Sequence, residues 1–345
     1  MVRLAFAASL LAAAAPAIAA PVTIHAGRLI AVPGQPVRGP STIVVDNGRI
    51  VSVTAGLQPA TGQLIDLKDR TVLPGLIDAH VHLDSDRAGN EGQLAEFTDS
   101  VPLHAFETQM NGMKTLRAGF TTVRNLGDGE NGYSLAYRDA IARGWVQGPR
   151  IVSAGQSIST TGGHMDGRNG TNDQTDAHAS THHLCDGPAD CRRAVRQQVS
   201  RGADVIKIAT TGGVNSGTGL LTRMEEDEAV ALIKTAHAYG RKVAVHAHGR
   251  DGIKLALRNG ADSIEHGTDM DDETIRLFRQ AGACYVPTLS TVNGYLERLA
   301  KDPNAYAPAV KKQIDWRIGI TGKSLEKAHP AGVRICFGTD AGVSK

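Results

Sequence analysis

The segment GADVIKIATTGG (residues 202–213) shows a strand-and-loop pattern that recurs from residue 75 onward. A short apolar run with β-branched residues leads into a loop of two threonines and two glycines, which is typical of a buried strand that ends in a turn. Lys207 lies in the middle of this run, although an unpaired ammonium is among the most costly groups to bury. The strand therefore raises the question of what this lysine does inside the protein.

Seven further segments repeat this combination of a glycine and a short apolar strand. They are GLIDAHVH (75–82), AGFTTVRNLG (118–127), GPRIVSAG (148–155), GRKVAVHAHG (240–249), GADSIEHG (260–267), GACYVPT (282–288) and GVRICFGTDAG (332–342). Helical runs such as EDEAVALIKTAHAY (226–239) and DDETIRLFRQA (271–281) separate them. Eight strand–helix units predict an α/β fold, a (β/α)8 TIM-type barrel with its helices outside. A doubly wound open sheet is the alternative, which the absence of GxGxxG after a strand disfavours.

The region before the barrel has a different pattern. Short alternating strands and polar turns run from about residue 22 to residue 70, and TIVVDNGRIVSV (42–53) is typical of a hairpin with Asn47 and Gly48 in its turn. We therefore predict a small N-terminal β-sandwich module over residues 20–73 and the barrel over residues 74–345.

The first 19 residues are typical of a signal peptide. Arg3 precedes the apolar stretch LAFAASLLAAAAPAIA (4–19), which ends in a small-residue cleavage pattern. A retained anchor helix is the alternative, but the run is short for a membrane span. We expect a periplasmic or secreted protein that has no membrane contact after signal removal.

The four cysteines fit an oxidising compartment. Cys185 and Cys191 lie in the turn-rich segment CDGPADC, where a short disulfide loop could close. Cys284 and Cys336 lie in apolar runs, and we expect them to be packed, inert thiols. The chain has no CxxC pair, which disfavours a zinc ribbon.

The overall composition disfavours a nucleic-acid partner. The formal net charge is +2, and aromatic residues make up only 4% of the 345 residues, too few to suggest a stacking platform for bases. We expect a small-molecule partner and leave a homo-oligomeric assembly open.

Polar side chains gather at the C-terminal ends of the predicted strands, where barrel enzymes build their sites. They are His80, His82, Lys207, His246, His248, His266 and Asp340. His80 and His82 are two residues apart on one strand, so both point to the same side and could form half of a metal site. Any one of these histidines could be a core residue, but the set as a whole indicates a site.

These segments resemble the amidohydrolase superfamily. GLIDAHVH matches its first-strand motif, HAHG and EHG its fifth- and sixth-strand histidines, and GTDAG its eighth-strand aspartate. The segments CRRAVRQQVSRGADVIKI, TTGG and DSIEHGT are similar to a group of secreted Xaa-Pro dipeptidases, metal carboxypeptidases and ochratoxin-hydrolysing amidases. In that superfamily the chain continues past the GTDAG segment, so the resemblance implies a C-terminal part that is missing after Lys345.

The resemblance implies a role for the buried lysine and two divalent metal ions. Carbon dioxide would convert Lys207 into a carbamate that bridges both metals. One metal would be held by His80, His82, Lys207 and Asp340, and the other by Lys207, His246 and His266. His246 is preferred to His248 because it precedes His266 by 20 residues, as in the family. A salt bridge of Lys207 is the alternative; zinc is the preferred metal, with manganese or cobalt left open.

The implied chemistry is hydrolysis of an amide bond next to a C-terminal amino acid, in dipeptides or N-acyl amino acids of the ochratoxin A type. The pKa of water at such a metal site falls to about 7. Asp340 would accept the proton of the attacking water and deliver it to the leaving amine. His164, in the loop TTGGHMDG, and His248 are candidates for substrate binding.

Two other functions compete with this hypothesis. An imidazolonepropionase-like hydrolase of cyclic amides or a deaminase would use one metal and would not need Lys207. A non-catalytic barrel scaffold is an alternative of another class, but such proteins usually lose ligands, and every expected ligand is present here.

Overall fold

The computed structural model of the chain describes residues 20–87, 94–95, 98–172, 180–216 and 218–343. The predicted signal peptide, residues 1–19, lies outside the described residues. The chain divides into two compact units between Gly75 and Leu76. Each unit is described by itself below.

The described residues of the first unit form a single four-stranded β-sheet. Its strands are β1 (Val22–Leu29), β2 (Ser41–Asp46), β3 (Arg49–Ala55) and β4 (Gln63–Val72), in the order β3-β2-β1-β4. β2 and β3 form the predicted hairpin, and Asn47 (φ 48°) and Gly48 (φ 72°) adopt the positive φ values that its tight turn requires.

The prediction of a β-sandwich is wrong for this unit. All four strands are hydrogen-bonded side by side into one layer, whereas a sandwich needs two layers packed face to face. Ala26, Leu29 and Ile43 form a small core on this sheet. Alternation in the sequence predicts that a strand buries one face, but it does not say whether a second sheet or another element covers that face.

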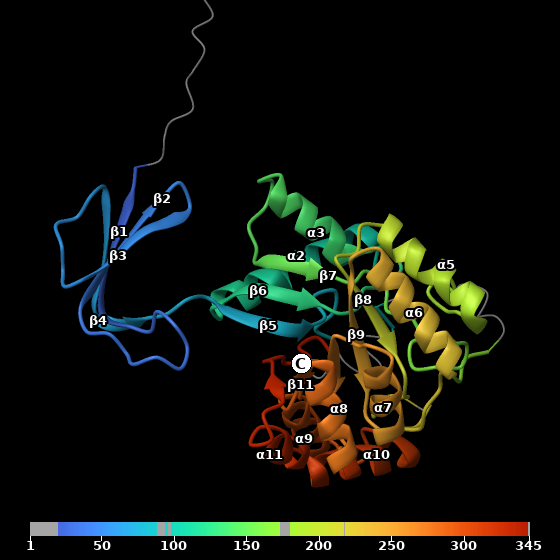
Figure 1. Cartoon of the computed structure of the whole chain (residues 1–345). Helices are drawn as coiled ribbons and strands as arrows, with labels where there is room; N and C mark the ends of the chain where they lie inside the picture. The colour runs from blue at the N-terminus through green and yellow to red at the C-terminus, as the bar shows by residue number, and fades with distance from the viewer. Residues whose placement is uncertain (1–19, 88–93, 96–97, 173–179, 217, 344–345) are drawn as a thin grey trace, which may run out of the picture. The chain divides into compact units, whose positions relative to one another are not determined.

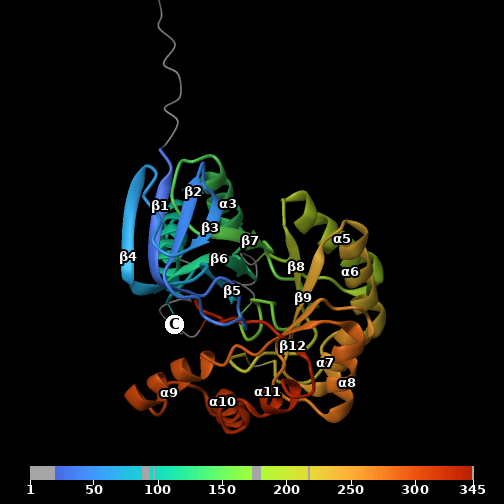
Figure 2. The same ribbon diagram turned by 60° about the vertical axis from the view of Figure 1, so that its left-hand side comes forward.

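The described residues of the second unit include eight parallel strands, and each lies within one of the predicted segments. They are β5 (Leu76–Val81), β6 (Phe120–Asn125), β7 (Arg150–Ser153), β8 (Val205–Ala209), β9 (Lys242–Ala247), β10 (Ser263–His266), β11 (Cys284–Val286) and β12 (Arg334–Ile335). They form a three-stranded sheet, β5-β6-β7, and a five-stranded sheet, β12-β11-β10-β9-β8 (Figure 2). Parallel bridges join the two sheets at both edges, between Ile158 and Ile208 and between Val81 and Ala341.

Helices connect these strands. They are α2 (Val101–Arg117), α3 (Tyr133–Ala142), α5 (Gly187–Ser200), α6 (Glu226–Ala238), α7 (Arg250–Arg258), α8 (Asp272–Ala281), α9 (Thr291–Lys301), α10 (Pro308–Ile320) and α11 (Lys323–Ala328). Both helical runs quoted from the sequence are confirmed, as α6 and α8. Helices α5 to α8 lie along the outer side of the five-stranded sheet (Figure 1). Within the described ranges, none of the helices has the length and apolar character needed to cross a membrane.

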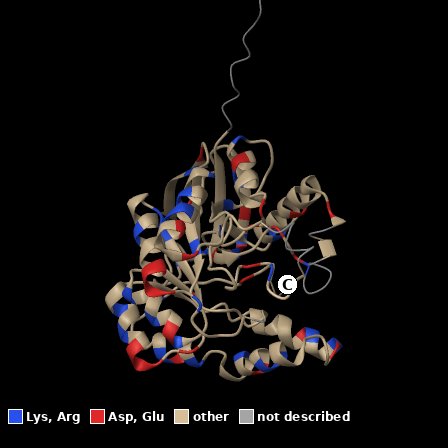
Figure 3. Ribbon diagram, turned by 90° about the vertical axis from the view of Figure 1, so that its right-hand side faces the viewer, with Lys and Arg blue, Asp and Glu red and all other residues tan. Residues whose placement is uncertain are grey.

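Alternation along the strands separates the helix-facing core from the interior. Ile206 and Ile208 of β8 belong to the large apolar cluster that the helices complete, whereas Val205 belongs to a separate interior cluster with Ala244 of β9. Lys207 and His246 share the parity of these two interior residues, so both point inward. Charged residues of both signs are interspersed along the helices (Figure 3).

The cysteines form two disulfides. The predicted pair, Cys185–Cys191, is confirmed. The expectation of free thiols at Cys284 and Cys336 is wrong, because these two residues form the second disulfide with a Cα–Cα distance of 6.0 Å. β11 and β12 are parallel neighbours, so residues that are 52 positions apart in the sequence come within bonding distance.

Candidate metal centre

His80 and His82 face the interior of the second unit from the end of β5. Each is oriented by a hydrogen bond from its Nδ1, to Glu265 Oε2 (2.9 Å) for His80 and to the Gly127 carbonyl (3.1 Å) for His82. Both acceptors lack a proton to donate, so Nδ1 donates in both rings. The Nε2 atoms then face Asp340 Oδ1, at 3.2 Å from His80 and 3.4 Å from His82.

The charges of this group favour a cation between its atoms. Burial, and then the nearby Lys207, lower the pKa of His80 to about 4, so its Nε2 carries a lone pair at neutral pH. Burial would raise the pKa of Asp340, but His80 and His82 outweigh it and lower that pKa to about 2. A neutral imidazole and a carboxylate therefore direct electron pairs at one another, which is the donor arrangement of a divalent metal site.

Lys207 is buried beside the same atoms. Its side chain is 1% exposed, and its Nζ lies 3.4 Å from His80 Nε2. Among the described residues, no carboxylate forms an ion pair with it, although Glu265 and Asp340 act on it at longer range. Burial lowers the pKa of Lys207 to about 8. The alternative of a direct salt bridge thus finds no partner in the described part of the chain.

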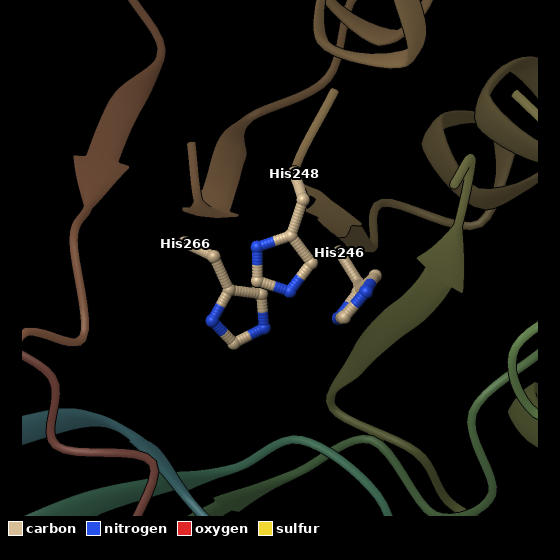
Figure 4. A group of neighbouring side chains, drawn as sticks. All are labelled: His246, His248 and His266. Carbon is tan, nitrogen blue, oxygen red and sulfur yellow. The ribbon is translucent and has the colours of Figure 1, made fainter. Parts of the chain in front are cut away.

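A second group consists of His246, His248 and His266, whose ligand atoms lie within 4.8 Å of one another. Figure 4 shows the three rings turned toward one another from the ends of β9 and β10. His246 Nε2 donates to the Gly212 carbonyl at 3.2 Å, and His266 Nδ1 lies 2.8 Å from Thr288 Oγ1. His266 also belongs to a group with His80 and Asp340, so it connects the two clusters.

Unusual backbone conformations occur at the strand ends that carry these groups. His266 (φ 70°), Thr288 (φ 44°) and Asp340 (φ 61°) adopt positive φ values that side-chain-bearing residues rarely take. Such conformations are costly, and they cluster at functional sites in proteins. At the end of β10 the left-handed conformation of His266 allows two residues that are adjacent in sequence, Glu265 and His266, to contact the site together.

His164 lies against the second group. Its ring stacks on that of His246 with centroids 4.0 Å apart, and a Cβ added to Gly213 would fall 2.2 Å from its Cε1. The loops after β7 and β8 therefore meet at the site. His164 Nδ1 is buried without a hydrogen-bond partner among the described residues, and burial lowers the pKa of this ring to about 4.

A cavity of about 880 Å³ lies next to the first group. His82 lines it together with Asp84, Asp128, Ser157 and Met165. Because His82 also contacts Asp340, this cavity gives a small molecule room beside the candidate metal ligands.

The structure brings together all the site residues proposed from the sequence, and their individual roles stay predictions. It adds residues that the sequence analysis missed. Glu265 accepts hydrogen bonds from His80, Arg124 and Ser263 and is fully buried. Its inward position could have been found from the alternation in β10, where Ile264 faces the helices. Thr268 and Thr288, which contact His248 and His266, carry no recognisable signal.

Comparison with known proteins identifies the family and several similar hydrolases. The sequence profile of the amidohydrolase family matches residues 71–345. Ochratoxinase of Aspergillus niger is 29% identical over 344 residues, which cover 92% of this chain and 68% of that protein. A crystal structure of a Xaa-Pro dipeptidase with bound methionine in the active site is 38% identical, with a TM-score of 0.88 over 94% of this chain and 80% of the other.

A crystal structure of a prolidase complexed with N-methylphosphonate-L-proline is 31% identical, with a TM-score of 0.81 over 94% of this chain and 79% of that one. The buried histidine and aspartate clusters are of the kind that holds divalent metals in such hydrolases. Because the family profile extends over most of the sequence, this chain belongs to the amidohydrolase family.

Proposed function

We propose that this hydrolase uses two metal ions to cleave the amide bond to a C-terminal amino acid, in dipeptides or in N-acyl amino acids of the ochratoxin A type. One observation carries the proposal: Lys207 is buried beside His80 without an ion-pair partner among the described residues. A single-metal deaminase or cyclic-amide hydrolase has no need of a lysine at this position. Conversion of Lys207 to a carbamate would explain why an amine is buried here, because the carbamate would supply two oxygen ligands and a negative charge to the metals.

The donor set fits two divalent ions. The first would be held by His80, His82, Asp340 and the carboxylated Lys207, and the second by His246, His266 and the same lysine. Zinc is the preferred ion because imidazole and carboxylate ligands suit it. When bound, such ions lower the pKa of water and polarise a carbonyl group.

Asp340 would move the proton. It is a carboxylate at neutral pH and lies at the centre of the first group, so it can accept a proton from the attacking water. The water oxygen forms a bond to the carbonyl carbon, and the carbon–nitrogen bond breaks. Asp340 then returns the proton to the leaving amine, and the products are a carboxylate and a free amino acid.

The relatives support this substrate class. Ochratoxinase and Xaa-Pro dipeptidase are the names of similar proteins, and a bound methionine occupies the active site of one of them. His164 and His248 lie at the second group, and we propose that they bind the substrate's terminal carboxylate.

Two further proposals concern architecture and location. The eight parallel strands and the bridges at both sheet edges support a closed TIM-type barrel. The two disulfides support a periplasmic or secreted location, because such bonds persist in oxidising compartments.

A substrate panel tests the proposal. The zinc-loaded protein should release the C-terminal amino acid from dipeptides and N-acyl phenylalanine, and amidation of the substrate carboxylate should lower kcat/KM sharply. Cyclic amides and amino-heterocycles are the control set. Turnover of the control set alone would replace this function with that of a cyclic-amide hydrolase or deaminase.

A further inference from the structure

Arg317 of α10 is a buried cation next to the site. Its side chain is 2% exposed, and it donates hydrogen bonds to Thr268 Oγ1 (2.6 Å) and to the Pro287 carbonyl (3.0 Å). No carboxylate in the described ranges forms an ion pair with it. A buried charge without a counter-ion is costly, so its two hydrogen bonds call for a functional explanation.

The hydroxyl of Thr268 connects Arg317 to the histidines. A guanidinium can only donate, so the Thr268 oxygen accepts the bond from Arg317. The other partner of this hydroxyl is His248 Nδ1, at 2.8 Å. Thr268 is buried, and within the described residues its hydrogen has no other acceptor.

The surroundings of Thr268 determine which atom donates in its hydrogen bond with His248. If His248 Nδ1 donated to Thr268, the hydroxyl hydrogen would be left buried and unpaired. The short bond from a cation also polarises the hydroxyl and makes it a better donor. Thr268 therefore donates to His248 Nδ1, and the ring proton resides on Nε2.

This arrangement is the reverse of that in the first group. His80 donates from Nδ1 and keeps a lone pair on Nε2, which suits a metal ligand, and His82 likewise donates from Nδ1. His248 instead directs an N–H from Nε2. Proximity alone makes His246, His248 and His266 equivalent as candidate ligands. His248 differs from His266 in one respect: its threonine partner also accepts a hydrogen bond from a buried guanidinium, whereas Thr288, the partner of His266, accepts no such bond within the described residues.

We propose that Arg317, acting through Thr268, holds His248 as an Nε2–H donor for a carboxylate oxygen of the substrate. Arg317 and Thr268 are positioning residues in this scheme, because neither needs to touch the substrate. The assignment of the proton stands on the hydrogen bonds alone, whereas the carboxylate acceptor rests on the proposed function.

Nuclear magnetic resonance of the metal-free protein, labelled with ¹⁵N in histidine, tests the assignment. The signals of His248 are those missing from His248→Gln, and long-range ¹H–¹⁵N correlations should show its proton on Nε2. Thr268→Val should abolish this single tautomer, and Thr268→Ser should restore it. Thr288→Val is the matched control, since it removes the partner of His266 and should leave His248 unchanged. A proton on Nδ1 of His248 in the parent protein would overturn the proposal.

Metal content and kinetics test the consequence. His248→Gln should bind as much zinc as the parent, and Thr268→Val should raise KM for a free-carboxylate dipeptide about tenfold with little change in kcat, since one hydrogen bond to a charged group is weakened. Thr268→Ser should restore KM. Loss of a zinc ion from His248→Gln would contradict the proposal. A parent protein without amidase activity would refute the proposed function instead, and the tautomer would still decide the role of Arg317.

Discussion

His80 and Glu265 form a buried hydrogen-bonded pair, with His80 Nδ1 2.9 Å from Glu265 Oε2 and both side chains at most 1% exposed. Burial alone would raise the pKa of Glu265, but Arg124 and His80 lower it to about 2, so the pair contains a carboxylate. This carboxylate fixes the ring proton on Nδ1 and directs Nε2 toward Asp340.

Glu265→Gln should weaken metal binding because an amide holds the His80 ring less firmly in this tautomer. Affinity for zinc should fall roughly 10–100-fold, as is usual when the outer partner of a ligating histidine is lost. Competition with a chelator measures this change. Glu273→Gln, on helix α8 outside the site, is the matched control and should keep the parent affinity. Equal affinities in both variants would show that Glu265 does not support a metal ligand.

Lys207→Ala should lose metal and activity together, because it removes the proposed bridge between the two ions. A short carboxylic acid should restore part of the activity by standing in for the carbamate. Lys242→Ala, which removes an exposed lysine, is the control. Metal analysis decides the point: an unchanged metal content in Lys207→Ala would show that Lys207 is not a bridge.

Asp340→Asn should nearly abolish kcat while metal stays bound, because the amide keeps one oxygen donor but cannot carry the proton. Steady-state kinetics on metal-loaded protein measure this effect. Turnover within a few-fold of the parent would remove Asp340 from proton transfer.

The two disulfides should differ in their contribution to stability. Cys284–Cys336 joins residues 52 positions apart, whereas Cys185–Cys191 joins residues 6 positions apart. On loop entropy alone, replacing the first pair by alanine should cost about 2 kcal/mol more of unfolding free energy than replacing the second. Urea unfolding of both double variants provides the comparison. Equal losses, or free thiols in the oxidised parent protein, would be inconsistent with this pairing.

The strands and most site residues could be predicted because each leaves a local signal. Glycine and apolar alternation mark β8 and β9, and the inward parity of Lys207 and His246 follows from the strand period of two. Contacts between residues that are far apart in the sequence leave no such local signal. The bond between Cys284 and Cys336 depends on which strands are neighbours, a relation that lies outside either segment.

Supporting residues were missed for a related physical reason. The contact between Arg317 and Thr268 joins residues 49 positions apart, and nothing in either local sequence predicts it. His266 shows a second limit, since its positive φ turns it toward the site although its neighbour Glu265 occupies the inward position of the strand. Periodicity describes regular strands, and the site is built where the strands end.

Titration of the metal-free protein with zinc, followed by amino-acid release from an N-acyl phenylalanine, measures how many metal ions the site needs for activity. Two groups of candidate ligands that share His266, with the buried Lys207 beside the first, predict that activity rises until two zinc ions are bound per chain and then stays constant. Full activity in the metal-free protein, or a plateau at one zinc ion per chain, would contradict the two-metal site.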